Sequence, residues 1–203
     1  MSHIALIGAS GSAGSRILRE LTDRGHRVTA IARHPERIAE LPGVIAVKGD
    51  AQDLQGMTSA LRGHDAVVSA VNFTSSEPRT LIEAVRASGV KRYLVVGGAG
   101  SLEVAPGQRV IDLPDFPEAY KAEASGGAAF LEQLGQESDL EWTFLSPSAE
   151  FVPGERTGQF RLGKDALLSN AQGSRISFED YAVALVDEIE HPAHVRQRFT
   201  VGY

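Results

Sequence analysis

The sequence predicts an α/β fold, a single domain (1–203) built on a doubly wound parallel sheet, and three observations support this prediction. Strand and helix patterns alternate over residues 1–100, as they do when helices connect parallel strands. The strand segments are continuous apolar runs, which are typical of strands covered on both faces. The chain has 203 residues, enough for one domain with a sizeable hydrophobic core.

The first strand is predicted over residues 4–7, and a turn that contains Gly8, Gly11 and Gly14 follows it. At this spacing the first glycine permits a tight bend, the second lets the backbone approach a pyrophosphate, and the third lets the next helix pack on the sheet. Ser12 is the expected N-cap of that helix, whose N-terminus would direct backbone N–H groups at an anion. The turn predicts a Rossmann-type dinucleotide site, with a purely structural turn as the alternative.

The second strand is predicted over residues 27–32, after a helix end near Gly25, and it completes a strand–helix–strand unit. Dinucleotide sites selective for NAD carry an acidic residue near the end of this strand, whereas an arginine there can neutralise the 2'-phosphate of NADP. Here the strand is followed by Arg33 and His34, with Arg37 one helical turn further. The pattern favours NADP over NAD, and the alternative is a solvated surface pair of arginines.

Three further parallel strands are predicted at residues 44–47, 65–71 and 92–96, with amphipathic helices between them. Ligands of such sheets bind at the carboxyl ends of the strands. The residues at those ends are small, glycine-rich or polar, as a long cofactor lying across the edge requires. The predicted cofactor-binding residues there are Gly8, Ser10, Gly11, Ser12, Ala13, Gly14, Arg33, His34, Asp50, Ala51, Ala70, Val71, Asn72, Gly97 and Gly98.

Residues 101–203 are less regular and are expected to form a small irregular substrate-side portion, whereas residues 1–100 form the nucleotide-binding half. A loop with proline and glycine at 102–116 is long enough for a lid or a substrate loop. The remaining predicted elements are a helix at 117–134, a strand at 142–145, an irregular stretch at 151–168, a helix that starts after Ser177 and a strand at 199–201.

The irregular stretch carries Arg156 and Arg161 and leaves the strand that ends at Pro147, so it is expected to lie over the nicotinamide end of the cleft. Arginine binds phosphate and carboxylate groups in a bidentate manner, which makes both residues candidate substrate ligands. The alternative is that they pair at the surface with the nearby acidic residues Glu150, Glu155 or Asp165.

The composition argues against several other classes of function. The chain has no cysteine, and of its six histidines only His191 and His194 are close together, so no metal site is expected. A net charge of -6 disfavours nucleic acid as a partner. No apolar run reaches the roughly 18 residues of a membrane span, so we expect no membrane association and a cytoplasmic location.

With these residues in place, the chain resembles the atypical short-chain dehydrogenase/reductases, in particular the NmrA-like, NADH-flavin reductase branch. The resemblance is carried by GASGSAG (8–14), IARHPER (31–37), GDAQD (49–53), VVGGAGSL (95–102), SPSAEFVPGERTGQFR (146–161) and ISFEDYAVALVDEIE (176–190). It implies a Rossmann-type NAD(P) site in which Asp50 and Ala51 contact the adenine and residues 70–72 flank the ribose. Gly97 and Gly98, together with Pro147 and Ser148, would border the nicotinamide.

The chain departs from this superfamily at its catalytic motif. Typical members use a Tyr, a Lys four residues later and a Ser at the end of the fifth strand to move a proton to a carbonyl. Here Tyr120 is followed at that spacing by Ala124, although Lys121 is adjacent, and the Ser position reads Gly97 or Gly98. Tyr120 and Ser101, a few residues beyond the strand, are the remaining catalytic candidates, and the usual carbonyl reduction is not expected.

A flavin or quinone can accept a hydride without a strong acid from the protein. We therefore predict an NAD(P)H-dependent reductase of a flavin, a quinone or a similar small-molecule acceptor. The missing Tyr/Lys pair also fits the alternative of an NmrA-like redox sensor that binds NAD(P) and a protein partner without catalysis. An epimerase or dehydratase is a third alternative, although the second half leaves little room for a sugar-nucleotide domain, and a homodimer is compatible with the sequence.

Overall fold

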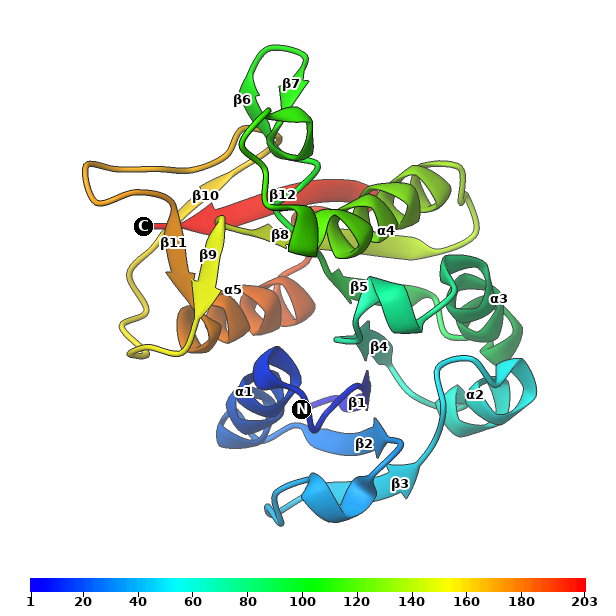
Figure 1. The fold of residues 1–203 in the computed structure, drawn as a ribbon. Helices are drawn as coiled ribbons and strands as arrows, with labels where there is room; N and C mark the ends of the chain where they lie inside the picture. Colours follow the sequence, from blue (N-terminus) through cyan, green and yellow to red (C-terminus); the bar gives the residue numbers. More distant parts are fainter.

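A computed structural model describes residues 1–203 and shows an eight-stranded sheet between two layers of helices (Figure 1). The strand order is β10-β12-β8-β5-β4-β1-β2-β3, and every neighbouring pair is parallel except β10 with β12. The strands of this sheet are β1 (His3–Ile7), β2 (Arg27–Ala32), β3 (Val44–Lys48), β4 (Ala66–Ser69), β5 (Arg92–Val96), β8 (Glu141–Pro147), β10 (Arg161–Gly163) and β12 (Gln197–Gly202). The predicted doubly wound α/β fold is confirmed.

Five α-helices cover the sheet, and two small sheets lie outside it. The helices are α1 (Ser12–Asp23), α2 (Leu54–Leu61), α3 (Pro78–Ser88), α4 (Glu118–Gly135) and α5 (Phe178–Glu190). The small sheets are the antiparallel hairpin of β6 (Glu103–Ala105) with β7 (Gln108–Arg109) and the parallel pair of β9 (Glu150–Val152) with β11 (Arg175–Ser177). None of the helices combines the length and the apolar character needed to cross a membrane.

The helices divide between the two faces of the sheet, with α1 and α5 on one face and α2, α3 and α4 on the other (Figure 1). Strand β1 shows how the sequence builds both cores. Its buried residues alternate, because successive side chains point to opposite faces of a strand. Ile4 and Leu6 pack in the core beneath α1 and α5, whereas Ala5 and Ile7 pack beneath α2 to α4. The uninterrupted apolar run of β1 is therefore explained by a core on each side.

Three details of the structure differ from the sequence-based expectations. Gly11 and not Ser12 is the N-cap of α1, since Gly11 has extended backbone angles and Ser12 is already helical. Strand β10 enters the main sheet in the antiparallel direction, within the stretch expected to be irregular. The loop at 102–116 contains the β6–β7 hairpin and a short 3-10 helix, Val110–Asp112, so it is more ordered than its composition indicates.

Candidate functional site

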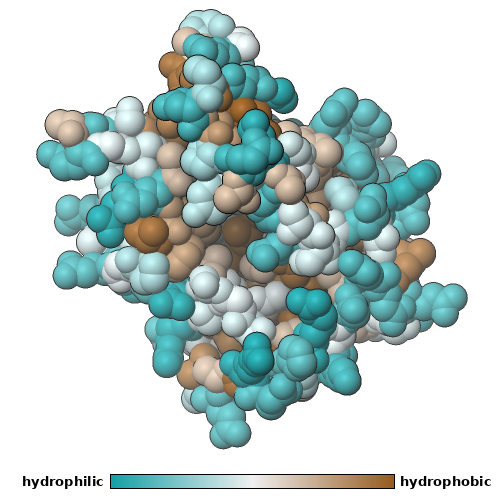
Figure 2. All heavy atoms as spheres, in the orientation of Figure 1, coloured by the Kyte–Doolittle hydropathy of each residue, from teal (hydrophilic) through white to brown (hydrophobic).

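Two adjoining pockets lie at the carboxyl ends of the parallel strands. The smaller has a volume of about 220 Å³ and the larger about 710 Å³, and both are lined by Gly11 and by Ala70, Val71 and Asn72. They therefore form one continuous cleft across the end of β1 and β4. Figure 2 shows the molecule hollowed near the middle of this face, with hydrophobic and neutral residues in the hollow and hydrophilic residues around it.

The glycine turn after β1 is shaped by two close backbone approaches. Gly8 has φ +84, and a Cβ there would lie 2.3 Å from the carbonyl oxygen of Ala70. A Cβ on Gly14 would lie 2.1 Å from the carbonyl oxygen of Gly8, so α1 packs directly on the turn. Gly11 is different, because its nearest atom would be 3.3 Å away and the residue faces both pockets. Gly8 and Gly14 thus fix the fold of the turn, while Gly11 leaves space in the cleft.

The N-terminus of α1 opens into the same cleft. No side chain caps it and its first turn carries no acidic residue, while Ser12 and Ala13 line the larger pocket. The first N–H groups of a helix have no partner within the helix, and the helix dipole favours an anion beside them. The space kept free by Gly11 next to these N–H groups fits the pyrophosphate of a dinucleotide.

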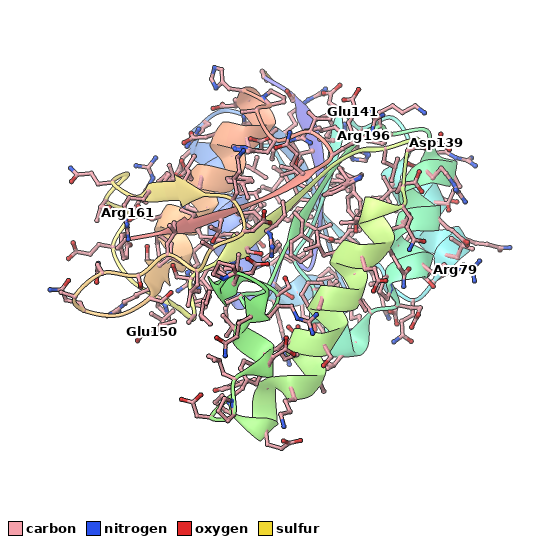
Figure 3. The ribbon with its side chains drawn as sticks, turned by 90° about the horizontal axis from the view of Figure 1, so that it is seen from above. Arg79, Asp139, Glu141, Glu150, Arg161 and Arg196 are labelled. Atoms are coloured by element: carbon pink, nitrogen blue, oxygen red, sulfur yellow. The ribbon has the colours of Figure 1, made fainter.

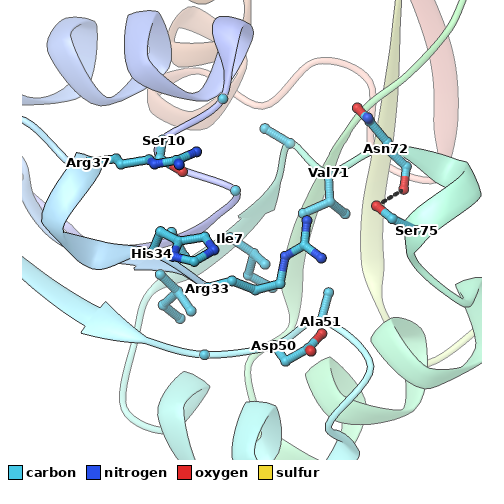
Figure 4. A pocket seen from close by; sticks show the side chains of 16 residues that line it. Ile7, Ser10, Arg33, His34, Arg37, Asp50, Ala51, Val71, Asn72 and Ser75 are labelled. Carbon is cyan, nitrogen blue, oxygen red and sulfur yellow. Dashed lines mark hydrogen bonds between the residues drawn. The ribbon is translucent and has the colours of Figure 1, made fainter.

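The smaller pocket brings together residues from the ends of β2, β3 and β4. Arg33, His34 and Arg37 enter from one side, Asp50 and Ala51 lie below them, and Val71 and Asn72 face them (Figure 4). The carboxylate of Asp50 accepts a hydrogen bond from the backbone N–H of Gln52 at 3.0 Å, which fixes its orientation. Two arginines beside the cleft give this pocket the charge expected for a phosphate-bearing ligand.

The larger pocket is mostly apolar and continues from the glycine turn toward α4. The predicted residues Ser12, Ala13, Gly97, Gly98, Tyr120, Pro147 and Ser148 line it. The loop expected to be a lid or substrate loop contributes Val110, Leu113, Asp115 and Phe116, and Phe151 comes from the start of the stretch expected over the nicotinamide end. The sequence-based reasoning missed Phe73, Glu123 and Phe178. Of the predicted cofactor residues, Gly14 alone lies outside both pockets, because it is covered by the turn.

Two glycines after β5 allow tight packing beneath the larger pocket. A Cβ on Gly97 would lie 2.3 Å from the ring of Phe144, and a Cβ on Gly100 would lie 2.7 Å from the Cβ of Ala124. Ala124 occupies the position where the superfamily motif has its lysine. The contact with Gly100 gives a physical reason for the small residue there, since the loop after β5 lies against α4 at this point.

A buried tyrosine supports the end of β8 next to this packing. The carbonyl oxygen of Leu145 accepts hydrogen bonds from the Tyr181 hydroxyl at 2.7 Å and from the Gly97 N–H at 2.8 Å. Burial raises the pKa of Tyr181 well above its ordinary value, so the hydroxyl stays protonated and donates to the carbonyl. Tyr181 lies on α5 and outside both pockets, so its contribution is to hold β5 and β8 in place.

Helix α4 also holds the segment that supplies Phe73 to the larger pocket and Ser75 to the smaller one. The carboxylate of Glu123 accepts hydrogen bonds from the backbone N–H groups of Phe73 and Thr74, at 2.8 and 2.9 Å, and from the Thr74 hydroxyl at 3.0 Å. A Cβ on Gly127 would lie 2.9 Å from the Phe73 ring, so the ring lies against the helix backbone. The short 3-10 helix Phe73–Ser75 is therefore held against α4 by its hydrogen bonds to Glu123 and by the packing of the Phe73 ring on the helix backbone.

The structure separates the two catalytic candidates. The Ser101 hydroxyl accepts a hydrogen bond from Arg198 at 3.0 Å, and Ser101 lies outside both pockets, which corrects its placement as a catalytic candidate. Tyr120 lines the larger pocket at its mouth and is 65% exposed. Lys121 is no substitute for the missing lysine, because its ammonium group pairs with Glu118 at 2.6 Å.

The expectation that Arg156 and Arg161 lie over the nicotinamide end is corrected by the structure. Arg156 donates two hydrogen bonds to the carboxylate of Glu20 on α1, and Arg161 donates to the carbonyl oxygens of Ser169 and Tyr203. Neither arginine lines either pocket of the cleft. Arg156 does form an ion pair, but with a residue distant in sequence and not with the neighbouring carboxylates proposed as the alternative.

The loop that carries Arg156 turns toward α5 because acidic side chains of that helix hold its backbone. Asp180, which is fully buried, accepts hydrogen bonds from the N–H groups of Thr157 at 2.8 Å and Gly158 at 2.7 Å. Glu179 accepts one from the Gly154 N–H at 2.8 Å. These contacts draw the loop over α1 and α5 and away from the mouth of the cleft.

Comparison with known proteins relates this chain to NAD(P)H-binding proteins. A family model described as NAD(P)H-binding matches residues 8–192. The chain is 42% identical to the uncharacterized protein YwnB of Bacillus subtilis, over 98% of this chain and 97% of the relative. It is 28% identical to a (4-alkanoyl-5-oxo-2,5-dihydrofuran-3-yl)methyl phosphate reductase of Streptomyces griseus, over 98% of this chain and 67% of that enzyme.

Two solved structures share both the fold and much of the sequence. A Bacteroides thetaiotaomicron protein named as a proposed epimerase has a TM-score of 0.94 and 44% identity, and the match covers 99% of this chain and 96% of that one. A Streptococcus pneumoniae protein named as a proposed NADH-flavin reductase has a TM-score of 0.81 and 36% identity, with coverage of 100% and 99%.

Proposed function

Because the chain belongs to the NAD(P)H-binding family of atypical short-chain dehydrogenase/reductases, we propose that it is an NADPH-dependent reductase that transfers hydride to a flavin, a quinone or a similar flat acceptor. The observation that carries the proposal is the larger pocket. It is continuous with the glycine turn, walled by aromatic and aliphatic side chains, and lacks the Tyr/Lys pair of carbonyl reductases. A pocket of about 710 Å³ lies in the range of sites for small organic ligands.

The residues of the cleft divide into binding groups and walls. The backbone around Gly11 and the N-terminus of α1 would hold the pyrophosphate, while Arg33 and Arg37 would hold the 2'-phosphate of NADPH. When bound, NADPH supplies the hydride from its nicotinamide ring. Gly98, where an added Cβ would meet no atom closer than 3.9 Å, leaves room for a ring at the end of β5, and Phe151 and other apolar residues exclude water there.

The relatives support a reductase without identifying the acceptor. The Streptomyces griseus relative is named as a reductase, and the Streptococcus pneumoniae structure is named for proposed flavin reduction. An epimerase needs protein groups that move protons on its substrate. In the larger pocket the ionisable side chains are Asp115, Tyr120 and Glu123, and Glu123 is already held by the backbone of the 73–75 segment. The pocket therefore favours an acceptor that needs little acid–base help.

Steady-state oxidation of NADPH in the presence of riboflavin, menadione and a series of other quinones tests the proposal. We expect turnover with at least one of them, and loss of turnover in Gly11→Val, which blocks the turn without removing a functional side chain. NADPH binding measured in parallel by fluorescence separates the two main alternatives. Tight NADPH binding without turnover of any acceptor would favour a redox sensor that acts through a protein partner.

A further inference from the structure

The larger pocket carries negative charge and no positive charge. None of its lining residues is a lysine, an arginine or a histidine, whereas Asp115 and Glu123 line it as carboxylates. Asp115 is exposed on the segment that leads into α4, and Glu123 is fixed one helical turn inside that helix by its hydrogen bonds to Phe73 and Thr74. Both charges therefore belong to the wall formed by the start of α4.

The cations near this pocket are held by carboxylates that lie outside it. Arg16 lies over the Phe178 ring at 5.7 Å, but its guanidinium pairs with Glu179 at 3.0 Å. Lys121 pairs with Glu118 and Arg156 with Glu20, each within 2.7 Å. Arg109, which precedes the pocket residue Val110, donates two hydrogen bonds to Asp112. These four cations are therefore engaged by carboxylates. The arginines of the cleft itself, Arg33 and Arg37, line the smaller pocket, where the 2'-phosphate of NADPH is expected.

Most of the other residues of the pocket wall are apolar or glycine. The aromatic rings of Phe73, Phe116, Phe151 and Phe178 line it together with Val110 and Leu113. Aromatic walls favour planar rings, which stack or meet them edge to face. The pyrophosphate expected at Gly11 would add further negative charge at the inner end of the cleft. The pocket thus combines affinity for a planar ring with repulsion of an anion.

We propose that the acceptor is an uncharged planar ring compound, and that Asp115 and Glu123 select against acceptors that carry a phosphate or a carboxylate. This inference rests on the proposed function, since it describes the ligand of the same pocket. It also reverses the expectation from sequence, in which two arginines would have attracted a phosphate. Riboflavin and FMN are the matched test pair, because they share one ring system and differ only by a phosphate group.

The first experiment measures both binding and turnover. The dissociation constants of riboflavin and FMN are determined by quenching of flavin fluorescence with the protein saturated by NADP+, and kcat/KM is determined with NADPH. We expect FMN to bind about 3- to 10-fold more weakly than riboflavin at low ionic strength, as a like charge several ångströms away in a solvated cleft implies. Added salt should strengthen FMN binding and leave riboflavin binding unchanged, because salt screens the repulsion between the FMN phosphate and the two carboxylates.

Asp115→Asn should reduce the difference between the dissociation constants of FMN and riboflavin. Asp139→Asn is the matched control, since it removes the same charge just before the amino end of β8, at the opposite end of the strand from the cleft. There Asp139 lies near Glu141 and Arg196 and far from Glu150 (Figure 3). We expect this control variant to keep the wild-type ratio of the FMN and riboflavin dissociation constants. Glu123→Gln is a poorer probe, because it also weakens the acceptor for two backbone N–H groups.

The outcomes separate this inference from the proposed function. FMN binding that equals or exceeds riboflavin binding at low salt, or that weakens as salt is added, would overturn the inference and indicate a cation at the acceptor. If riboflavin binds more tightly than FMN but no acceptor is reduced by NADPH, the inference that the pocket takes an uncharged planar ring is supported and the proposed reductase activity is wrong. If FMN is turned over as efficiently as riboflavin, the reductase stands and the selection against anions is wrong.

Discussion

Arg156 donates hydrogen bonds from Nε and Nη2 to the two carboxylate oxygens of Glu20, at 2.7 and 2.8 Å, across 136 positions of sequence. The Glu20 side chain is only 4% exposed and also accepts from Arg24 at 2.7 Å. Burial alone would raise the pKa of Glu20, but the hydrogen bonds from Arg156 and Arg24 outweigh it and lower the pKa below 4.5. The pair joins the loop after β9 to the C-terminal part of helix α1.

Arg156→Ala should therefore reduce stability and leave ligand binding unchanged. The arginine side chain is about half exposed, so we expect a loss of about 1 to 2 kcal/mol in the free energy of unfolding, measured by urea denaturation. Arg19→Ala is the control, since Arg19 is an exposed arginine of α1 without an ion pair. A raised KM for a phosphorylated acceptor in Arg156→Ala, with stability unchanged, would restore the substrate role expected from sequence.

The same ion pair should make part of the stability depend on pH. The pKa of Glu20 is lower in the folded protein than its ordinary value of 4.5. The ionised carboxylate therefore makes its full contribution to the free energy of unfolding above pH 4.5, and this contribution disappears as the pH falls through the pKa of the folded protein. We expect the stability difference between wild type and Glu20→Gln to be largest near pH 7 and to shrink below pH 4.5. Denaturation curves of both proteins across this range check it, and Glu179 cancels in the comparison because its partner is Arg16 and not Arg24 or Arg156. A difference that grows in acid would contradict the assignment.

Arg33→Ala should lower affinity for NADPH selectively. Arg33 reaches into the smaller pocket with Arg37, at the place expected for the 2'-phosphate (Figure 4). We expect a loss of about 1 to 3 kcal/mol for NADPH, the range for hydrogen bonds to charged groups, and almost none for NADH. Titration of both cofactors measures it, with Arg27→Ala as an arginine control at the other end of β2. Equal weakening of the two cofactors would mean that Arg33 does not select NADPH.

Substitutions of two glycines in the turn should have opposite consequences. Gly11→Val should fold, because its backbone angles suit any residue and the added Cβ meets nothing closer than 3.3 Å, yet it should abolish NADPH binding. Gly14→Val should fail to fold stably, because its Cβ would lie 2.1 Å from the Gly8 carbonyl oxygen. Circular dichroism and NADPH titration separate the two effects. Normal NADPH binding by folded Gly11→Val would show that the phosphates bind elsewhere.

Tyr120→Phe tests whether the acceptor needs a proton from the protein. Tyr120 lies at the mouth of the larger pocket without a lysine partner, so its hydroxyl is not activated in the manner of the superfamily motif. We expect kcat with riboflavin or menadione to change by no more than about 3-fold, well below the contribution typical of general acid catalysis. A loss of 100-fold or more would make Tyr120 a catalytic acid and redirect the search toward carbonyl substrates.

The sequence predicted the parts of this protein that depend on neighbouring residues. The glycine turn, the following helix and the apolar run of β1 are contiguous, and their spacing alone implies the strand–turn–helix that the structure shows. The strand ends also came together as expected, because right-handed crossovers bring the carboxyl ends of parallel strands to one edge. Thus Arg33, Asp50 and Asn72 line one pocket although they belong to three different strand ends.

The second half was harder because its order depends on contacts between distant segments. Nothing near Arg156 in the sequence indicates Glu20 as its partner, and nothing around Thr157 indicates that Asp180 accepts its N–H. The three-residue strand β10 is too short to show a period, and its antiparallel pairing depends on β12. The aromatic wall was missed for a related reason, since Phe73, Phe116 and Phe151 come from separate connections that only the fold assembles.

Strand β12 lies between β10 and β8 and is parallel to β8, although the ribosome makes it after both. During synthesis, β8 can add to β5 as soon as it emerges, but its other edge then has no partner until β12 follows. That open edge includes Phe144 and Leu145, which are buried once the fold is complete. An unpaired apolar edge is the kind of surface that recruits strands of other molecules. The nascent chain therefore exposes this apolar edge to other molecules during the interval between these two strands, and slower translation of that stretch should lower the yield of native protein.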